Sequence, residues 1–185
     1  MINTAKKLFY GLWIVVIVLL LIAYIRNPDL VTPDYIKSFI SSYGSEMMLV
    51  YICLTLIRGF FLIPSTPFVI AGGIMFPDQL LLVLGISMIG VMASATALYF
   101  FSDSLGFSHY LESKYPNKIG KLKPMLQDYR ATYFVLGWSF FPLVPTDLIC
   151  YVAGLVKMPF KYLFIGVFFG ELILDIFYVY FGSSL

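Results

Sequence analysis

Residues 80–101 read LLLVLGISMIGVMASATALYFF and contain no charged side chain, which makes this stretch decisive for the class of fold. A helix that crosses a lipid bilayer needs roughly 20 consecutive apolar residues, so the stretch predicts a membrane-spanning helix. Small residues suited to close helix packing are spread along it, namely Gly85, Ser87, Gly90, Ala93, Ser94, Ala95 and Ala97. The sequence therefore predicts an integral membrane protein.

The composition of the whole chain is that of a membrane protein. Of its 185 residues, 61% are hydrophobic and 12% are charged, and the mean hydropathy is +0.92. A soluble domain carries about 25% charged residues. The length allows one membrane domain with roughly four to six hydrophobic passes. A net charge of +2 with scattered basic residues predicts membrane lipids, and no nucleic acid, as the partner.

A second apolar stretch runs from Leu8 to Ile25, directly after Lys6 and Lys7. As a helix, its 18 residues extend about 27 Å, which is enough to span a bilayer. A secretory signal would have a shorter apolar core followed by a small-residue cleavage site, whereas this run ends in AYIRNP. We expect an uncleaved anchor whose N-terminus is cytoplasmic, because basic residues stay on that side.

A short helix in the membrane interface is predicted after the anchor. Thr32 and Pro33 have the chemistry of a helix start. Apolar residues then recur at helical spacing, at Ile36, Phe39, Ile40 and Tyr43. The anchor and this helix form residues 1–46, and a membrane domain occupies residues 47–185.

Two apolar segments, residues 47–77 and 131–159, are interrupted by proline and glycine. The prolines at their expected turns are Pro64, Pro67, Pro142 and Pro145. Proline breaks a helix, and irregular backbone at membrane depth is tolerated only inside protein or along a cavity. Each segment therefore predicts a re-entrant hairpin.

The two hairpins belong to an expected internal repeat. Each is followed by an apolar stretch, at residues 80–101 and 160–181. A shift of 81 residues superposes Phe60 on Phe141, Pro64 on Pro145, Gly73 on Gly154 and Gly85 on Gly166. The repeat unit is thus a hairpin plus a transmembrane helix.

Charge placement predicts how the repeats are oriented. Residues 102–130 carry five basic side chains against three acidic ones, so the positive-inside rule places them in the cytoplasm. A fully spanning segment 47–63 would instead place them outside. The hairpins then enter from opposite faces, as in transporters with inverted repeats. The predicted fold is an all-α integral membrane protein with an inverted repeat of re-entrant hairpin plus transmembrane helix, an extra N-terminal transmembrane helix, and an outside C-terminus.

Four charged residues, Arg58, Asp147, Glu171 and Asp175, are predicted at membrane depth. Each would cost about 2.5 to 3.5 kcal/mol at the centre of a spanning helix, so we expect them to face one another or a water-filled cavity. One cation against three carboxylates favours carboxylates that hold protons and gate a path. The alternative is that Arg58 makes one structural ion pair while the acids reach interfacial water or headgroups.

The proline turns of both hairpins are candidate binding positions. Half-helix ends present dipoles and free carbonyl groups, which can bind a polar headgroup or a cation. The alternative is that Pro64, Pro67, Pro142 and Pro145 only fix the turns.

No pattern of catalytic or metal-binding residues is visible. Cys53 and Cys150 lie in apolar runs without metal or redox spacing and are expected to be packing residues. The only histidine, His109, lies in the polar stretch, and no Ser/His or Cys/His arrangement occurs. We expect no enzyme activity, no metal and no cofactor.

The hairpin motifs resemble the DedA superfamily, and within it the VTT-domain, "SNARE-associated" branch. The first motif runs from Arg58 through PSTP (64–67) to AGGIMF (71–76), and the second from FPLVPTD (141–147) to YVAGL (151–155). The resemblance covers about residues 45–182. One departure is Ser139, where the family often has an arginine three residues before the first proline of the second hairpin.

The resemblance implies a lipid translocator of a bacterial cell membrane, either a scramblase or a flippase of phospholipid or polyprenyl-phosphate type. Arg58, the arginine that does match, would meet the lipid phosphate, and Asp147, Glu171 and Asp175 would line or gate the path. The alternatives are a proton-coupled transporter of a small solute and a non-catalytic structural membrane factor.

Overall fold

The computed structural model describes residues 4–104, 114, 124–141 and 145–182, and all regular elements within these ranges are helical. The α-helices are α1 (Thr4–Arg26), α2 (Pro33–Ser41), α3 (Met47–Ile57), α4 (Thr66–Met75), α5 (Leu80–Ser104), α8 (Arg130–Ser139), α9 (Thr146–Leu155) and α10 (Phe160–Phe181). Short 3-10 helices connect the first of them: η1 (Pro28–Val31), η2 (Gly44–Glu46), η3 (Arg58–Phe61) and η4 (Pro77–Gln79). The predicted all-α class is confirmed.

Two helical stretches, Pro77–Ser102 and Phe160–Phe181, are long and apolar enough to cross a membrane. They correspond to α5 and α10. Both expose large apolar side chains along their length, including Leu81 at 75% and Ile89 at 63% on α5 and Phe181 at 57% on α10. Exposed apolar surface on this scale is unusual for a soluble monomer and is consistent with contact to lipid.

Helix α2 begins where the sequence predicted. The Thr32 hydroxyl accepts a hydrogen bond from the Tyr35 backbone N–H at 3.3 Å, and a proline follows the cap. Ile36 and Ile40 are buried, and α2 packs on α4. Phe39 is exposed, so the buried face of α2 is narrower than the predicted set of four apolar residues.

The prolines break the hairpins at the predicted places. After α3, the chain turns through η3 and Leu62, which has a φ of 57°, and Pro64 precedes α4. Pro67 lies in the first turn of α4, where its missing N–H costs no helical hydrogen bond. Pro145 has an extended conformation directly before α9. Pro142 lies outside the described residues.

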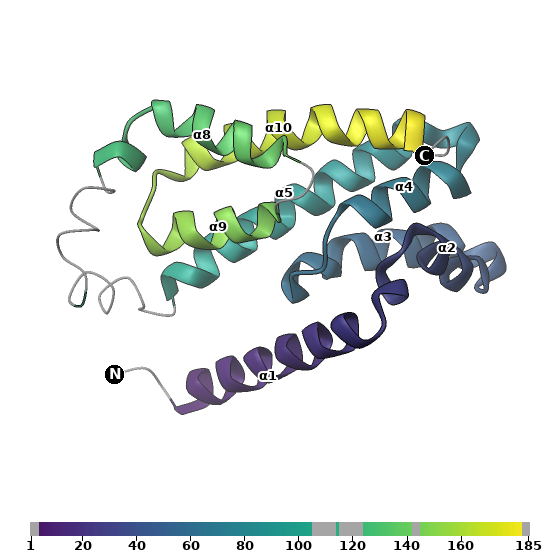
Figure 1. Ribbon diagram of the computed structural model, residues 1–185, viewed down its shortest axis with the longest axis horizontal. Helices are drawn as coiled ribbons and strands as arrows, with labels where there is room; N and C mark the ends of the chain where they lie inside the picture. Colours follow the sequence, from purple (N-terminus) through teal and green to yellow (C-terminus); the bar gives the residue numbers. More distant parts are fainter. Residues whose placement is uncertain (1–3, 105–113, 115–123, 142–144, 183–185) are drawn as a thin grey trace.

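The two hairpins pack on the long helices in the same pattern (Figure 1). Helices α3 and α8 pack on α5 and α10 respectively, the long helix of their own half. Helices α4 and α9 also pack on the long helix of the other half, α10 and α5 respectively. Figure 1 shows α3 and α4 entering from one end of the α5/α10 pair and α8 and α9 from the opposite end, so that α3 and α8 end, and α4 and α9 begin, near the middle of the pair.

Glycines permit the crossed contacts between the halves. A methyl group on Gly73 of α4 would lie 2.6 Å from the Val179 carbonyl oxygen of α10. A methyl group on Gly154 of α9 would overlap the Tyr99 carbonyl oxygen of α5. Gly73 and Gly154 are a pair matched by the 81-residue shift, so equivalent residues make equivalent contacts.

Glycines also permit close contacts between helices within each half. A methyl group on Gly90 of α5 would lie 2.8 Å from the Thr55 carbonyl oxygen of α3, and one on Gly170 of α10 would lie 2.9 Å from the Leu136 carbonyl oxygen of α8. Gly85 is different, because a methyl group there meets nothing within 4 Å. The prediction that Gly85 serves close packing is therefore wrong, and Gly90 has that role.

Candidate functional site

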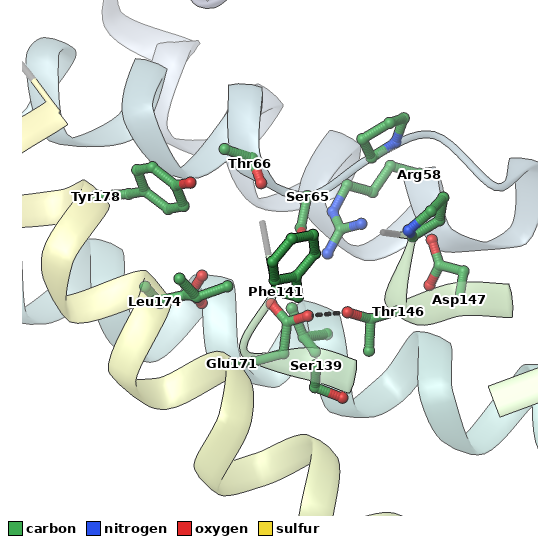
Figure 2. A pocket seen from close by; sticks show the side chains of 14 residues that line it. Arg58, Ser65, Thr66, Ser139, Phe141, Thr146, Asp147, Glu171, Leu174 and Tyr178 are labelled. Atoms are coloured by element: carbon green, nitrogen blue, oxygen red, sulfur yellow. Dashed lines mark hydrogen bonds between the residues drawn. The ribbon is translucent and has the colours of Figure 1, made fainter. Parts of the chain in front are cut away.

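A cavity of about 110 Å³ lies where the turns of the two hairpins meet α5 and α10 (Figure 2). It is called the polar cavity below. The first hairpin contributes Arg58, Pro64, Ser65 and Thr66; the second contributes Ser139, Phe141, Pro145, Thr146 and Asp147; the long helices contribute Val91, Glu171, Leu174, Asp175 and Tyr178. The four charged residues predicted at membrane depth thus share one cavity.

Arg58 is held by the turn that follows it. Its side chain is only 3% exposed, and its Nη1 donates a hydrogen bond to the Ile63 carbonyl oxygen at 3.1 Å. The Arg58 carbonyl in turn accepts from the Ile63 N–H at 3.2 Å. Arg58 Nε is buried without a hydrogen-bond partner. The guanidinium is therefore positioned by the backbone and keeps a donor free.

No carboxylate within the described ranges forms an ion pair with Arg58. Its charge nonetheless acts on Asp147, Glu171 and Asp175, which are close enough for electrostatic interaction. Figure 2 shows the guanidinium and the Asp147 carboxylate on the same side of the polar cavity. The structural ion pair, which was the alternative role for Arg58, is not formed among these residues.

Glu171 and Asp175 lie one turn apart on α10, with exposed fractions of 3% and 1%. The Thr146 hydroxyl, in the first turn of α9, donates a hydrogen bond to a Glu171 carboxylate oxygen. This bond joins the second hairpin to α10 (Figure 2). Asp175 Oδ2 is buried without a hydrogen-bond partner, so the cavity wall contains a free acceptor as well as a free donor.

Asp147 lies in the first turn of α9 and is half-buried. A carboxylate at that position interacts favourably with the positive end of the helix dipole. The dipole of α9 therefore stabilises the Asp147 carboxylate, whereas Asp175 lies inside α10, away from the N-terminus of that helix.

The predicted turn prolines fall into three groups. Pro64 and Pro145 line the polar cavity. Pro67 belongs to α4 and does not line it. Pro142 lies outside the described residues.

Four polar residues of the cavity were not predicted as site residues from the sequence: Ser65, Thr66, Thr146 and Tyr178. Thr146 directly precedes Asp147 in the proline motif. Its position next to a predicted site residue could have identified it. Ser139 also lines the cavity, with its hydroxyl buried and unpartnered. The 81-residue shift aligns Ser139 with Arg58 in the sequence. Equivalent positions of the two hairpins therefore line the same polar cavity.

The polar cavity contains groups that can bind a ligand. Cys53 is exposed and Cys150 is buried, and both are free thiols. Within the described residues, no group of three His, Cys, Asp or Glu side chains is arranged to hold a metal ion. The polar cavity can instead bind a small polar group through a free guanidinium donor and a free carboxylate acceptor, both desolvated before the ligand arrives.

Two long apolar helices are consistent with a membrane protein. The family model described as the VTT domain matches residues 63–184. The chain therefore belongs to the VTT-domain family, which is the DedA/SNARE-associated family. The match starts after Arg58, later than the expected residue 45. Neither the comparison with curated proteins nor that with solved structures gives a match.

Proposed function

We propose that this protein translocates lipids across a bacterial cell membrane by passing their headgroups through the polar cavity. In this proposal both hairpins are re-entrant, the N-terminus is cytoplasmic and the C-terminus is outside. The lipid is of the phospholipid or polyprenyl-phosphate type, and the protein acts as a scramblase or flippase. No bond of the lipid is made or broken, so the protein is not an enzyme and needs no cofactor.

The observation that carries the proposal is the buried guanidinium of Arg58. A buried charge without a matching partner costs several kcal/mol, roughly 3 to 5 when a pair is broken. Charged residues with this energetic cost occur at membrane depth mainly where function requires the charge. A guanidinium offers a planar set of donors that matches a phosphate group. The free Nε of Arg58 therefore supports binding of a lipid phosphate.

The arrangement of the hairpins supports a path for that phosphate. Both hairpins turn near the middle of the α5/α10 pair (Figure 1), so the polar cavity lies between their tips. A headgroup that enters from either side would have only half of the protein's length to cross before it meets Arg58. The acyl chains would stay in an apolar environment throughout.

The charge balance of the polar cavity constrains the protonation of its three acidic side chains. One guanidinium faces three carboxylates. The excess negative charge would be offset by bound protons or by the cationic amine of a zwitterionic headgroup. Asp175, with its free acceptor, is the natural contact for such an amine.

The same three buried acids favour a second candidate, a proton-coupled transporter of a small solute. A cavity of about 110 Å³ holds several water molecules, which is enough for a small polar solute. This candidate needs no contact with lipid.

The test is reconstitution of the full chain in liposomes that contain a fluorescent phospholipid in both leaflets. An external reductant bleaches only the outer leaflet, so lipid translocation raises the bleached fraction above one half. We expect this increase with the wild-type protein and little of it with Arg58→Ala. Solute uptake driven by a proton gradient without lipid translocation would favour the transporter, and absence of both would favour a structural factor.

A further inference from the structure

Two apolar cavities lie between α1 and the hairpin turns. The larger, of about 360 Å³, is lined by Trp13, Ile17 and Val18 of α1 and by Leu148 and Tyr151 of α9. The smaller, of about 180 Å³, is lined mainly by apolar side chains of α1, η1 and η3. Leu62 lines both cavities. Together they form an apolar groove along the inner face of α1, called the α1 groove below.

The α1 groove shares walls with the polar cavity. Pro145 and Asp147 line both the polar cavity and the larger apolar one. Pro64 lines both the polar cavity and the smaller apolar one. A charged compartment and an apolar compartment therefore adjoin at the turns of both hairpins, and this combination fits an amphiphile.

Helix α1 closes the groove without filling it. Trp13 of α1 makes a ring contact with Phe101 of α5, with centroids 4.7 Å apart. The principal contacts of α1 beyond the adjoining η1 are with η3. Figure 1 shows α1 running along one side of the molecule, from below α9 to below α3. The space between α1 and the hairpin turns is lined by apolar side chains, so it suits an apolar ligand.

Leu62 is strained at the point where the two apolar cavities adjoin. Its φ of 57° belongs to the left-handed region, which a bulky residue rarely adopts. Such strain costs on the order of 1 to 3 kcal/mol and is concentrated at ligand clamps and switch regions. Leu62 lines both apolar cavities, so its side chain would contact a chain bound in the α1 groove.

We propose that the α1 groove binds one acyl chain of a lipid whose headgroup lies in the polar cavity. The proposal rests on the proposed function in taking a membrane lipid as the ligand. Helix α1 is then the lateral wall of the lipid site, and lipids enter between α1 and α9. Binding of one chain would orient the headgroup toward Asp147 and Arg58 before translocation.

The experiment uses the full chain in phosphatidylcholine vesicles doped with phosphatidylcholine that carries a diazirine at the end of one acyl chain. After irradiation, peptide mass spectrometry locates the labelled residues. We expect labels on the α1 groove at Ile17 and Tyr151, which are less exposed than Val15, well above those at Val15. Equal labelling of Val15, which is 53% exposed and outside the groove, would mean ordinary contact with bulk lipid and would overturn the proposal.

Matched variants on α1 test occupancy of the groove. Ile17→Trp fills the larger cavity from the buried side of α1, whereas Val15→Trp adds the same side chain on the exposed side. We expect Ile17→Trp to lower labelling of Tyr151 at least threefold and Val15→Trp to leave it unchanged. Equal effects of the two variants would overturn the proposal. Leu148→Trp, compared with Val152→Trp on the same helix, repeats the test if Ile17→Trp fails to fold.

Lipid translocation, measured in the same vesicles, separates this proposal from the proposed function. Groove labelling without translocation would support the acyl-chain site and overturn the proposed function. Translocation without groove labelling would overturn the acyl-chain site alone.

Discussion

Arg58 combines two properties that rarely occur together, deep burial and an unpartnered donor. We expect Arg58→Ala to lower lipid translocation at least tenfold, because it removes the free donor that faces the polar cavity. Arg58→Lys is expected to restore only part of the activity, since an ammonium group cannot reproduce the planar fork. The measurement is the rate of reductant bleaching in proteoliposomes.

Lys37→Ala is the matched control for Arg58, because Lys37 is a solvated cation on α2. It should behave like the wild-type protein. Equal and small effects of Arg58→Ala and Lys37→Ala would remove the phosphate-binding role from Arg58.

The Thr146 hydrogen bond to Glu171 gives a prediction for stability. Thr146→Val leaves a buried carboxylate without its donor, so we expect a loss of about 1 to 3 kcal/mol in the free energy of unfolding. Thermal unfolding in detergent would measure it. Thr96→Val is the control, because the Thr96 hydroxyl only bonds the Met92 carbonyl of its own helix at 2.7 Å. A larger effect of Thr96→Val would show that the contact between α9 and α10 is not important for stability.

Charged residues of the site could be predicted from the sequence, whereas its neutral polar residues could not. A charge inside an apolar run carries a large transfer cost, so Glu171 and Asp175 stand out without a structure. Ser65 and Thr66 carry little such cost, and nothing in their sequence neighbourhood distinguishes them from turn residues. Their place in the cavity depends on the path of η3, which the sequence does not specify.

At the scale of elements, proline marks where the hairpins turn but not how they turn. Pro64 and Pro145 stand at the breaks before α4 and α9, as predicted. The left-handed conformation of Leu62 was not predictable, because leucine gives no turn signal. It arises from the end of η3, where the Leu62 N–H bonds to the Gly59 carbonyl at 3.2 Å and the next N–H bonds to the Arg58 carbonyl.

Two glycines of α5 make a matched test of helix packing. Gly90→Ala places a methyl group 2.8 Å from the Thr55 carbonyl oxygen of α3, so we expect a loss of about 1 to 3 kcal/mol. Gly85→Ala meets open space and should stabilise α5 by up to about 1 kcal/mol through helix propensity. Thermal unfolding in one detergent would compare them. A stabilising Gly90→Ala would contradict the packing of α3 on α5.

At the scale of the whole molecule, two oppositely directed halves stay a prediction, whereas the position of α1 could not be predicted. The basic stretch and the matched glycines indicated two oppositely directed halves, and the crossed contacts of α4 and α9 agree with that arrangement. Helix α1 is apolar on all sides, so no face of it indicates what it packs against. Its place beside the hairpin turns, and with it the α1 groove, comes from the structure alone.

The sidedness of the molecule provides the most direct test of the proposed architecture. In Figure 1, α1 begins at the end of the molecule where α5 ends and α8 begins, and α10 ends at the opposite end. Gln127 precedes α8 and Asp29 follows α1, and both are exposed. The positive-inside rule places Gln127 in the cytoplasm and Asp29 outside.

Single cysteines at Gln127 and Asp29 test this assignment in a background that carries Cys53→Ala and Cys150→Ala. We expect Asp29→Cys to react with an impermeant thiol reagent in intact cells, and Gln127→Cys to react only after the cells are opened. In the proposed architecture the two positions lie on opposite sides, because α1 and α5 would each cross the membrane once and the first hairpin would return to the side that it entered. If α3 instead crossed fully, α5 would bring Gln127 to the same side as Asp29. Labelling of Gln127→Cys from outside would therefore contradict a re-entrant first hairpin, and with it the lipid path between two opposed hairpin turns.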